Sequence, residues 1–504
     1  MTDSIKTTEK AFYEHMQKMS SYEQALGLLQ WDARTKIPKK GADSRAEVIG
    51  MLSTELFKLK TSDTSGRLVH RILEADSNEL STGTKRAAEE LKKEYDRSVQ
   101  IPEPEFQEYS ILTSKAESVW ETAKDNNDFE SFRPYLEKIV DFSRKFTEYW
   151  GYEGHPYNAL LKDYEPDMTV GTLDAVFQRL RERLVPLVED INASPNRPET
   201  DFLFRTFPKE NQQAVSETIL EQMTYDFEAG RLDETVHPFA LGLNPNDVRV
   251  TTKYDKMDFR TAVFGTIHEG GHALYEQNLP AEWRETVLCD AASMGIHESQ
   301  SLFWENFVGR SKAFWEKNYD LLKAYSNGQF EKVPLDDFYR AVNEAKPSFI
   351  RIEADELTYS LHIIARYEIE KKLINGDLQV KDLPEVWNEK MEQYLGITPP
   401  TDREGVLQDV HWSFGAFGYF PSYALGYIYA AQLHHAVRKE FPDLDSYIRS
   451  GNLSPVKQWL TTHVHQYGKT KTPADIMKDT TGEGINPDYL ITYLEDKYKP
   501  LYRL

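Results

Sequence analysis

Two histidines near the middle of the chain have the spacing of metal ligands. His268 and His272 stand four residues apart in the segment HEGGH, with Glu269 between them. Residues with this spacing share one face of a helix, about 5 to 6 Å apart, so both imidazoles can reach one ion. Glu269 would then flank a water molecule at the metal and act as its general base. The pattern indicates metal-assisted hydrolysis, and the alternative is an ordinary surface helix.

The two glycines inside this segment favour the functional interpretation. Gly270 and Gly271 each cost a helix about 1 kcal/mol relative to alanine, so helix stability does not account for them. Close approach of a neighbouring backbone or of substrate does account for them. We therefore expect a tight contact at this point of the helix.

The third metal ligand must come from another part of the chain, because a catalytic zinc site usually has three protein ligands and one open position. The candidate is Glu298, 26 residues after His272. His297 competes with it, since adjacent helical residues point about 100° apart and only one can face the metal. The other would then contact substrate or support one of the metal ligands. Glu305, on the same helix face as Glu298, would orient a ligand imidazole or remain a solvated carboxylate.

A helical scaffold has to position these residues, and the sequence predicts one. Apolar residues recur every three or four positions along most of the chain, for example at Phe12, Met16 and Met19. Prolines separate the periodic segments, and no flexible linker is present. We expect a mostly α-helical single unit with a helical N-terminal half over residues 1–235 and a catalytic half over residues 236–504.

Two segments beside the metal motif have the composition of β-strands. Residues 247–254 and 260–266 are rich in valine and threonine with partial alternation, which predicts two strands of a small sheet. The edge of such a sheet could bind an extended peptide as an additional strand.

Composition excludes several classes of function. The net charge is −22 and no run of basic residues could neutralise a phosphate backbone, so we expect no nucleic-acid partner. No apolar stretch approaches the roughly 18 to 20 residues of a membrane-spanning helix, and no secretory signal is recognisable. Cys289 is the only cysteine, which excludes an intrachain disulfide and fits a reducing compartment. We expect a cytoplasmic protein with no membrane partner.

Four further short motifs accompany HEGGH. They are D-x-R-x-T at Asp247, Arg249 and Thr251; HESQ at His297 to Gln300; I-R-x-x-A-D at Ile350, Arg351, Ala354 and Asp355; and G-x-x-Q-D-x-H-W at Gly405, Gln408, Asp409, His411 and Trp412. Together the five motifs closely resemble the M32 family of metallocarboxypeptidases, the group of carboxypeptidase Taq. The resemblance extends over the whole chain.

The resemblance implies a helical fold with a deep substrate groove, a small three-stranded sheet beside the metal, and a homodimer. It implies that Glu298 is the third ligand and that the cofactor is Zn²⁺, one per subunit. Cobalt or another divalent ion would suit the same ligands. A looser resemblance to angiotensin-converting and thimet-type peptidases implies that a His and a following Tyr assist the oxyanion. His411 with Tyr423 is the preferred pair, and Tyr419 is the second choice for the tyrosine.

A carboxypeptidase also needs a cation for the terminal carboxylate of its substrate. Arginine suits this role because its planar guanidinium binds a carboxylate through two parallel hydrogen bonds. Arg351 and Arg249 are the candidates, both inside the motifs above. For each, the alternative is a structural ion pair with a nearby acid such as Asp355 or Asp247.

The expected function is a zinc-dependent metallocarboxypeptidase of broad specificity that removes C-terminal amino acids from peptides. The first alternative is an oligopeptidase or dipeptidyl carboxypeptidase with the same zinc chemistry. The second is a peptide-binding protein with structural zinc, although such a site is normally closed by four ligands, often cysteines. We interpret Cys289 as a buried side chain rather than a nucleophile. The pairs His434–His435 and His463–His465 are interpreted as ordinary histidines rather than a second metal site.

Overall fold

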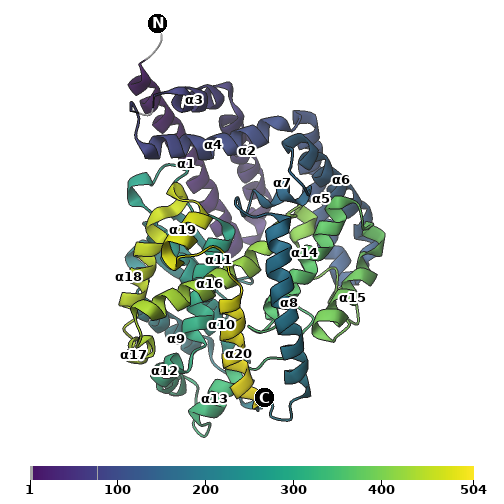
Figure 1. Ribbon diagram of the computed structural model, residues 1–504, viewed down its shortest axis with the longest axis vertical. Helices are drawn as coiled ribbons and strands as arrows, with labels where there is room; N and C mark the ends of the chain where they lie inside the picture. Colours follow the sequence, from purple (N-terminus) through teal and green to yellow (C-terminus); the bar gives the residue numbers. More distant parts are fainter. Residues whose placement is uncertain (1–3, 77) are drawn as a thin grey trace.

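Helices form most of the structure, and a small sheet lies among them (Figure 1). The computed structural model describes residues 4–76 and 78–504. The first helices are α1 (Ile5–Thr35), α2 (Ala42–Thr61), α3 (Asp63–Glu74), α4 (Thr82–Gln100), α5 (Glu103–Asn126), α6 (Phe129–Trp150), α7 (Tyr157–Leu161), α8 (Val170–Ala193), α9 (Lys209–Gln222) and α10 (Phe259–Gln277). The remaining helices are α11 (Met294–Leu302), α12 (Lys312–Tyr325), α13 (Leu335–Val342), α14 (Tyr359–Asn375), α15 (Leu383–Leu395), α16 (Pro421–Glu440), α17 (Leu444–Ser450), α18 (Ser454–His463), α19 (Pro473–Thr481) and α20 (Asp488–Tyr502).

The arrangement of these helices joins distant parts of the chain. Helices α1 to α4 gather at one end of the molecule, while α5, α6, α14 and α15 form one side (Figure 1). The C-terminal helix α20 packs against α8 and α16. The predicted mostly α-helical fold is confirmed. Helix α1 shows the predicted amphipathic pattern, because the residues at helical spacing, Phe12, Met16 and Met19, are buried.

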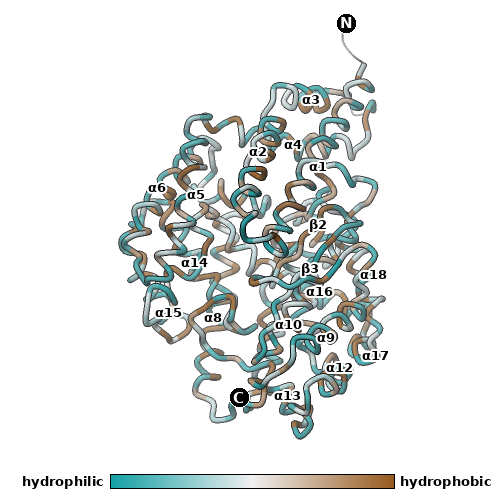
Figure 2. Tube along the Cα trace, turned by 180° about the vertical axis from the view of Figure 1, so that it is seen from behind, coloured by the Kyte–Doolittle hydropathy of each residue, from teal (hydrophilic) through white to brown (hydrophobic). Residues whose placement is uncertain are grey.

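The sheet has three strands in the order β1-β3-β2: β1 (Gly230–Glu234), β2 (Ala240–Asn244) and β3 (Asp247–Thr252). β1 runs parallel to β3, with Leu232 opposite Val250, and β2 runs antiparallel to it. Val248 and Val250 of the central strand are fully buried, and α10 packs against β2 and β3. Figure 2 shows these two strands beside α10. The sheet therefore lies directly against the helix that carries HEGGH.

One of the two predicted strands is wrong. Residues 260–266 belong to α10, whose N-cap is Asp258 with its carboxylate accepting from the backbone N–H of Arg260. The first turns of this helix are buried on more than one side, including Phe259, Ala262, Val263 and Phe264. A helix buried all round lacks a polar face, so its apolar residues do not show the helical period, and the valine and threonine content was misleading.

The two predicted halves share one hydrophobic core. A single cluster of buried side chains extends from Ala116 to Tyr502 and so crosses residue 235. The strand β1, which precedes that boundary, pairs with β3, which follows it. A smaller cluster around Phe12, Val69 and Leu91 holds the N-terminal helices together. Within the described residues, none of the helices has the length and apolar character needed to cross a membrane.

Candidate functional site

Three side chains converge with the donor set of a metal site. His268 and His272 come from α10 and Glu298 from α11, and their ligand atoms all lie within 4.8 Å of one another. The Nε2 atoms of the two histidines are 3.9 and 3.4 Å from Oε2 of Glu298. Two imidazoles and one carboxylate are the ligands of an open metal site, so these residues fit a divalent metal ion. Across residues 4–76 and 78–504, this is the one such group of His, Cys, Asp or Glu side chains.

Each ligand imidazole is held through its other ring nitrogen. Nδ1 of His268 donates to Oε2 of Glu305 at 2.9 Å, and Nδ1 of His272 donates to the backbone carbonyl of His297 at 3.1 Å. These bonds fix the tautomer and leave Nε2 of each ring as the metal-binding atom. Arg310 donates to the second oxygen of Glu305 at 2.8 Å. The orientation of His268 therefore depends on a chain of two further side chains.

His297 and Glu298 leave α11 in different directions. Nε2 of His297 lies 2.9 Å from Oε1 of Glu276, and its ring stacks on that of His272 with centroids 4.2 Å apart. The carboxylate of Glu298 instead faces both histidine Nε2 atoms. His297 thus supports His272 through its ring face and its carbonyl oxygen, while Glu298 completes the ligand group.

The glycines of HEGGH allow two helices to approach α10 closely. A Cβ on Gly271 would lie 2.6 Å from the backbone oxygen of Gln300 in α11, and a Cβ on Gly270 would lie 2.7 Å from Leu220 in α9. Gly426 has the same role on the other side of α11, where its Cβ would lie 2.6 Å from that of Glu298. The close backbone contact expected at this point is present at Gly271, whereas Gly270 faces side chains, and the contact at Gly271 brings Glu298 within reach of the histidines.

Glu305 stands in a π-helical segment, Phe303–Gly309, that continues α11. Such segments add a residue to a turn and frequently occur at functional sites. Because of this wider turn, Glu305 is not positioned by the regular helical spacing from Glu298 on which its prediction rested. Nothing in the sequence indicates the change of turn.

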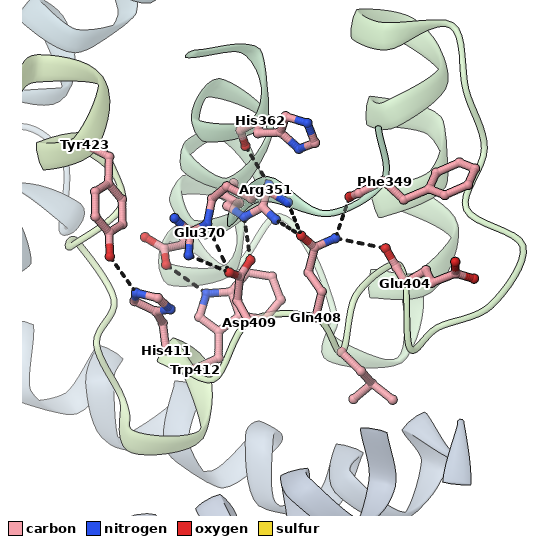
Figure 3. Close-up of polar contacts among 12 residues, drawn as sticks. Phe349, Arg351, His362, Glu370, Glu404, Gln408, Asp409, His411, Trp412 and Tyr423 are labelled. Carbon is pink, nitrogen blue, oxygen red and sulfur yellow. Dashed lines mark hydrogen bonds and ion pairs between the residues drawn. The ribbon is translucent and has the colours of Figure 1, made fainter. Parts of the chain in front are cut away.

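Arg351 belongs to a buried ion-pair network (Figure 3). Its Nε and Nη2 donate to Oδ1 of Asp409 at 3.0 and 2.9 Å, and Nε of Arg366 donates to Oδ2 of the same carboxylate at 2.6 Å. Burial alone would raise the pKa of Asp409, but the two guanidinium groups hold it well below its usual range. Asp355, considered as a partner for Arg351, instead accepts hydrogen bonds from backbone N–H groups of its own loop.

His411 and Tyr423 are hydrogen-bonded to each other. Nε2 of His411 and the hydroxyl of Tyr423 are 3.2 Å apart. Figure 3 shows the two side chains pointing toward each other. Burial lowers the pKa of His411 to about 4, so this imidazole is neutral at neutral pH. The Arg351 guanidinium lies over the Tyr423 ring, 4.8 Å from its centre, and the ring centres of Tyr419 and Tyr423 are 5.1 Å apart. The predicted oxyanion pair therefore contacts the predicted carboxylate anchor.

Three tyrosines, Tyr359, Tyr419 and Tyr423, lie close enough to Glu298 for its charge to raise their pKa values. Burial raises the pKa of Tyr419 to about 12, and the negative charge of Glu298 adds to the shift. Burial and the same charge also raise the pKa values of Tyr423 and Tyr359. Sequence reasoning missed Tyr359, which also contacts the Arg351 guanidinium. The one feature of the sequence that could have pointed to Tyr359 is its position shortly after the I-R-x-x-A-D motif.

Arg249 lies in a different environment from Arg351. Its Nε and Nη2 donate to the two oxygens of Asp247 at 2.7 and 2.9 Å, both residues being in β3. The guanidinium also lies 5.7 Å from the centre of the Trp31 ring of α1. This is the ion pair that was considered as the structural alternative for Arg249.

Cys289, His465 and His434 lie outside the group of metal-ligating side chains. Cys289 is partly buried, and burial raises the pKa of its thiol to about 12, so the nucleophilic thiolate is disfavoured. His465 is fully buried, and its Nε2 lies 2.9 Å from the side-chain oxygen of Gln300. His434 accepts from Nε of Arg438 at 3.0 Å.

The arrangement defines a class of protein. Two histidines one helical turn apart, a glutamate between them, and a second glutamate from a neighbouring helix form the site of a metallopeptidase. The helical fold and the small adjacent sheet agree with this class.

Comparison with known proteins gives the family. Residues 11–498 match the carboxypeptidase Taq (M32) metallopeptidase family. The chain is 55% identical over 500 residues to carboxypeptidase 1 of Bacillus subtilis, a match that covers 99% of this chain and 100% of the relative. Thermostable carboxypeptidase 1 of Thermus thermophilus is 39% identical over 510 residues, covering 98% and 100%. The crystal structure of an M32 carboxypeptidase from Deinococcus radiodurans R1 has a TM-score of 0.96 at 35% identity, covering 99% of this chain and 100% of the other.

The chain therefore belongs to the M32 family of metallocarboxypeptidases. It is a peptidase of the carboxypeptidase class, and the family requires a divalent metal.

Proposed function

We propose that this protein is a zinc-dependent carboxypeptidase that removes C-terminal amino acids one at a time from peptides of broad sequence. The observation that carries the proposal is the convergence of His268, His272 and Glu298, with both Nδ1 atoms already bound to acceptors. Nitrogen and carboxylate ligands in this number suit zinc, and they also accept cobalt and other divalent ions. Metal analysis of the purified protein decides between them.

We propose roles for the surrounding residues that their positions support. A bound divalent metal would supply Lewis-acid polarisation of the scissile carbonyl and a lowered pKa for water. Glu269, next to His268 on α10, takes the proton of the attacking water and delivers it to the leaving amine. Tyr423, supported by His411, donates a hydrogen bond to the developing oxyanion. One such donor typically contributes about 3 to 4 kcal/mol to the transition state.

Arg351 is the proposed anchor for the terminal carboxylate of the substrate. Its guanidinium contacts Tyr359 and lies over Tyr423, and both tyrosines are close enough to Glu298 to be influenced by its charge. A peptide end bound at Arg351 would thus lie near the metal ligands. Arg249, already paired with Asp247, remains the second candidate, and His297 and Tyr419 are proposed to line the substrate site.

The test is metal analysis combined with mass spectrometry of timed peptide digests, with and without a chelator. We expect a ladder of products, each one residue shorter at the C terminus, that disappears when the metal is removed. Products that lose two residues at a time would indicate a dipeptidyl carboxypeptidase instead, and internal fragments would indicate an oligopeptidase. An undiminished ladder after chelation would exclude the metal mechanism.

We further propose that residues 1–235 form part of the substrate groove and residues 236–504 carry the chemistry, within a cytoplasmic homodimer. The single cysteine, Cys289, supports a reducing compartment. Light scattering should give twice the chain mass of 58.4 kDa, and a monomer mass at micromolar concentration would contradict the dimer.

A further inference from the structure

The carboxylate of Asp409 serves two guanidinium groups at once. Arg351 occupies its Oδ1 and Arg366 its Oδ2, all at distances of 2.6 to 3.0 Å. The side-chain oxygen of Gln408 accepts from Nη2 of Arg366 at 2.7 Å and from the backbone N–H of Arg351 at 2.9 Å. Its amide nitrogen donates to the carbonyl oxygens of Phe349 and Glu404, both at 2.9 Å, so the amide cannot turn over (Figure 3).

Arg366 has no route to a substrate. The residue is 0% exposed, whereas Arg351 is 6% exposed. The Arg366 guanidinium lies 4.5 Å from the centre of the Trp387 ring and 5.5 Å from that of Phe420, which cover it. Nη1 of Arg366 donates to the carbonyl oxygen of His362 at 2.8 Å, on the preceding turn of α14. Any effect of Arg366 on substrate must therefore act through Asp409, Gln408 and Arg351.

The cluster carries more positive than negative charge. Arg351 and Arg366 share the single carboxylate of Asp409. Four further charged groups lie around them: Lys124 donates to the carbonyl oxygen of Gln408 at 2.8 Å, Glu370 accepts from Trp412 at 2.8 Å, and Arg403 and Asp125 lie near Lys124. Counting all four as ionised leaves four cations against three anions.

The nearby histidines do not change this balance. Burial lowers the pKa of His411 to about 4 and holds that of His362 well below its usual value, so both are neutral at neutral pH. The excess charge is also desolvated, and a charge buried in a low-dielectric interior interacts more strongly with a ligand of opposite sign. The cluster therefore lacks one anion.

We propose that Arg366 is a positioning residue that determines preference for a free C-terminal carboxylate. Asp409 alone would neutralise Arg351 and leave a satisfied ion pair facing the substrate. Because Arg366 competes for the same carboxylate, Arg351 keeps positive charge for a second anion, and the terminal carboxylate of a peptide supplies it. This inference rests on the proposed anchoring role of Arg351.

The test compares a blocked peptide that ends in a free carboxylate with the same peptide as its C-terminal amide. In Arg366→Gln, the pair of Arg351 and Asp409 becomes neutral. We expect KM for the free acid to rise about tenfold to hundredfold, the range expected for loss of a hydrogen bond to a charged group. The kcat for the free acid should change less, and the kinetic constants for the amide should not change. The double variant Arg366→Gln with Asp409→Asn restores one net positive charge, so it should recover much of the lost preference.

A purely structural role for Arg366 predicts the opposite pattern. The double variant, which breaks two contacts of the buried network, would then be worse than the single variant, and the acid and amide would be affected equally. Either result, or an unchanged KM in Arg366→Gln, would overturn the inference. Thermal melting and metal content of each variant identify a loss that comes only from misfolding.

Two further variants separate this inference from the function on which it rests. If Arg351→Gln keeps the full preference for the free acid, the proposed anchor itself is wrong. If Arg351→Gln loses the preference and Arg366→Gln keeps it, only the role of Arg366 is wrong. Arg181→Gln is the matched control, because Arg181 contacts α14 through Glu368 and lies outside the Asp409 cluster. It should leave the preference unchanged.

Discussion

Glu305 connects His268, a proposed metal ligand, to the partly buried guanidinium of Arg310. One of its oxygens accepts from Nδ1 of His268 and the other from Nη2 of Arg310. Arg310 is itself held by the carbonyl oxygen of Val342 at 3.2 Å and lies 3.9 Å from the centre of the Phe264 ring. A carboxylate behind a histidine ligand raises the basicity of the imidazole and fixes its orientation. Glu305 should therefore matter for metal affinity more than for substrate binding.

Replacing Glu305 by alanine should weaken metal binding about tenfold to hundredfold, because His268 loses the acceptor that holds its ring. Competition with a chelator of known affinity measures the change. Glu316→Ala is the control, since Glu316 pairs only with Arg449 at 3.4 Å near the surface in the contacts described. Equal metal affinity in Glu305→Ala and the control would show that the carboxylate does not orient the ligand.

For individual residues, the sequence predicts a site better when its members are close together in the chain than when they come from distant segments. His268, Glu269 and His272 lie within one helical turn, so their spacing alone predicts the site. The partner of Arg351 was missed because Asp409 is 58 residues away, and the choice between it and Asp355 depends on tertiary packing. Arg366 lies in none of the five sequence motifs. Its proposed role becomes apparent only from its contact with Asp409 in the structure.

Helices α10 and α16 both pack closely against α11, and glycines at the contact points make this close approach possible. At Gly271 the nearest atoms to an added Cβ are backbone atoms, the oxygen of Gln300 at 2.6 Å and Cα of Ser301 at 2.7 Å. Backbone atoms cannot rotate away as side chains do, so α11 would have to shift. Glu298 is on α11, and its distance to both histidines would change with it.

Gly271→Ala should lower the free energy of unfolding by about 1 to 3 kcal/mol, as overpacked core substitutions do, and should weaken metal binding. Gly265→Ala in the same helix is the matched control, because its nearest neighbour would be Oγ1 of Thr252 at an ordinary 3.7 Å. The control should gain up to about 1 kcal/mol from helix propensity. Urea unfolding of the metal-free proteins measures both, and equal stability of the two variants would contradict the close-packing account.

Elements were predictable where one face is buried and the other exposed. α1 shows this pattern, and its period gave the correct assignment. The helix α10 packs against β3, α9 and neighbouring helices, so residues 260–266 are apolar on several sides and their composition predicts a strand. The π-helical turn at Phe303–Gly309 depends on packing around it and has no sequence signal.

The whole molecule is held together by contacts between distant parts of the chain. Nε1 of Trp120 in α5 donates to the carbonyl oxygen of Leu407 at 3.0 Å, across 287 positions of sequence. The hydroxyl of Tyr493 in α20 donates to the carbonyl oxygen of Asn306 at 3.0 Å, behind the metal site. Composition and periodicity predicted a single helical unit, but they contain no information on which helices meet. Such pairings arise from the combined fit of many surfaces.

Buried histidines should make the stability of the whole fold sensitive to acid. Burial lowers the pKa of His465 from 6.5 to about 3, so the unfolded chain binds a proton there before the folded protein does. The stabilising contribution is fully present above pH 6.5 and is lost as the pH falls toward 3. Between about pH 7.5 and about pH 5 the wild type should lose about 2 kcal/mol relative to His465→Gln. Urea unfolding at the two pH values measures the difference, and parallel pH dependence in both proteins would refute it.

We propose that His268, His272 and Glu298 hold a metal at which Glu269 performs the proton transfers. The most direct measurement takes metal content and the rate of C-terminal amino-acid release from one preparation of Glu269→Gln and one of wild type. We predict full metal content in both proteins and a rate at least about a hundredfold lower in the variant, as expected for loss of a general base. A fully metallated Glu269→Gln protein that releases C-terminal residues at the wild-type rate would contradict it.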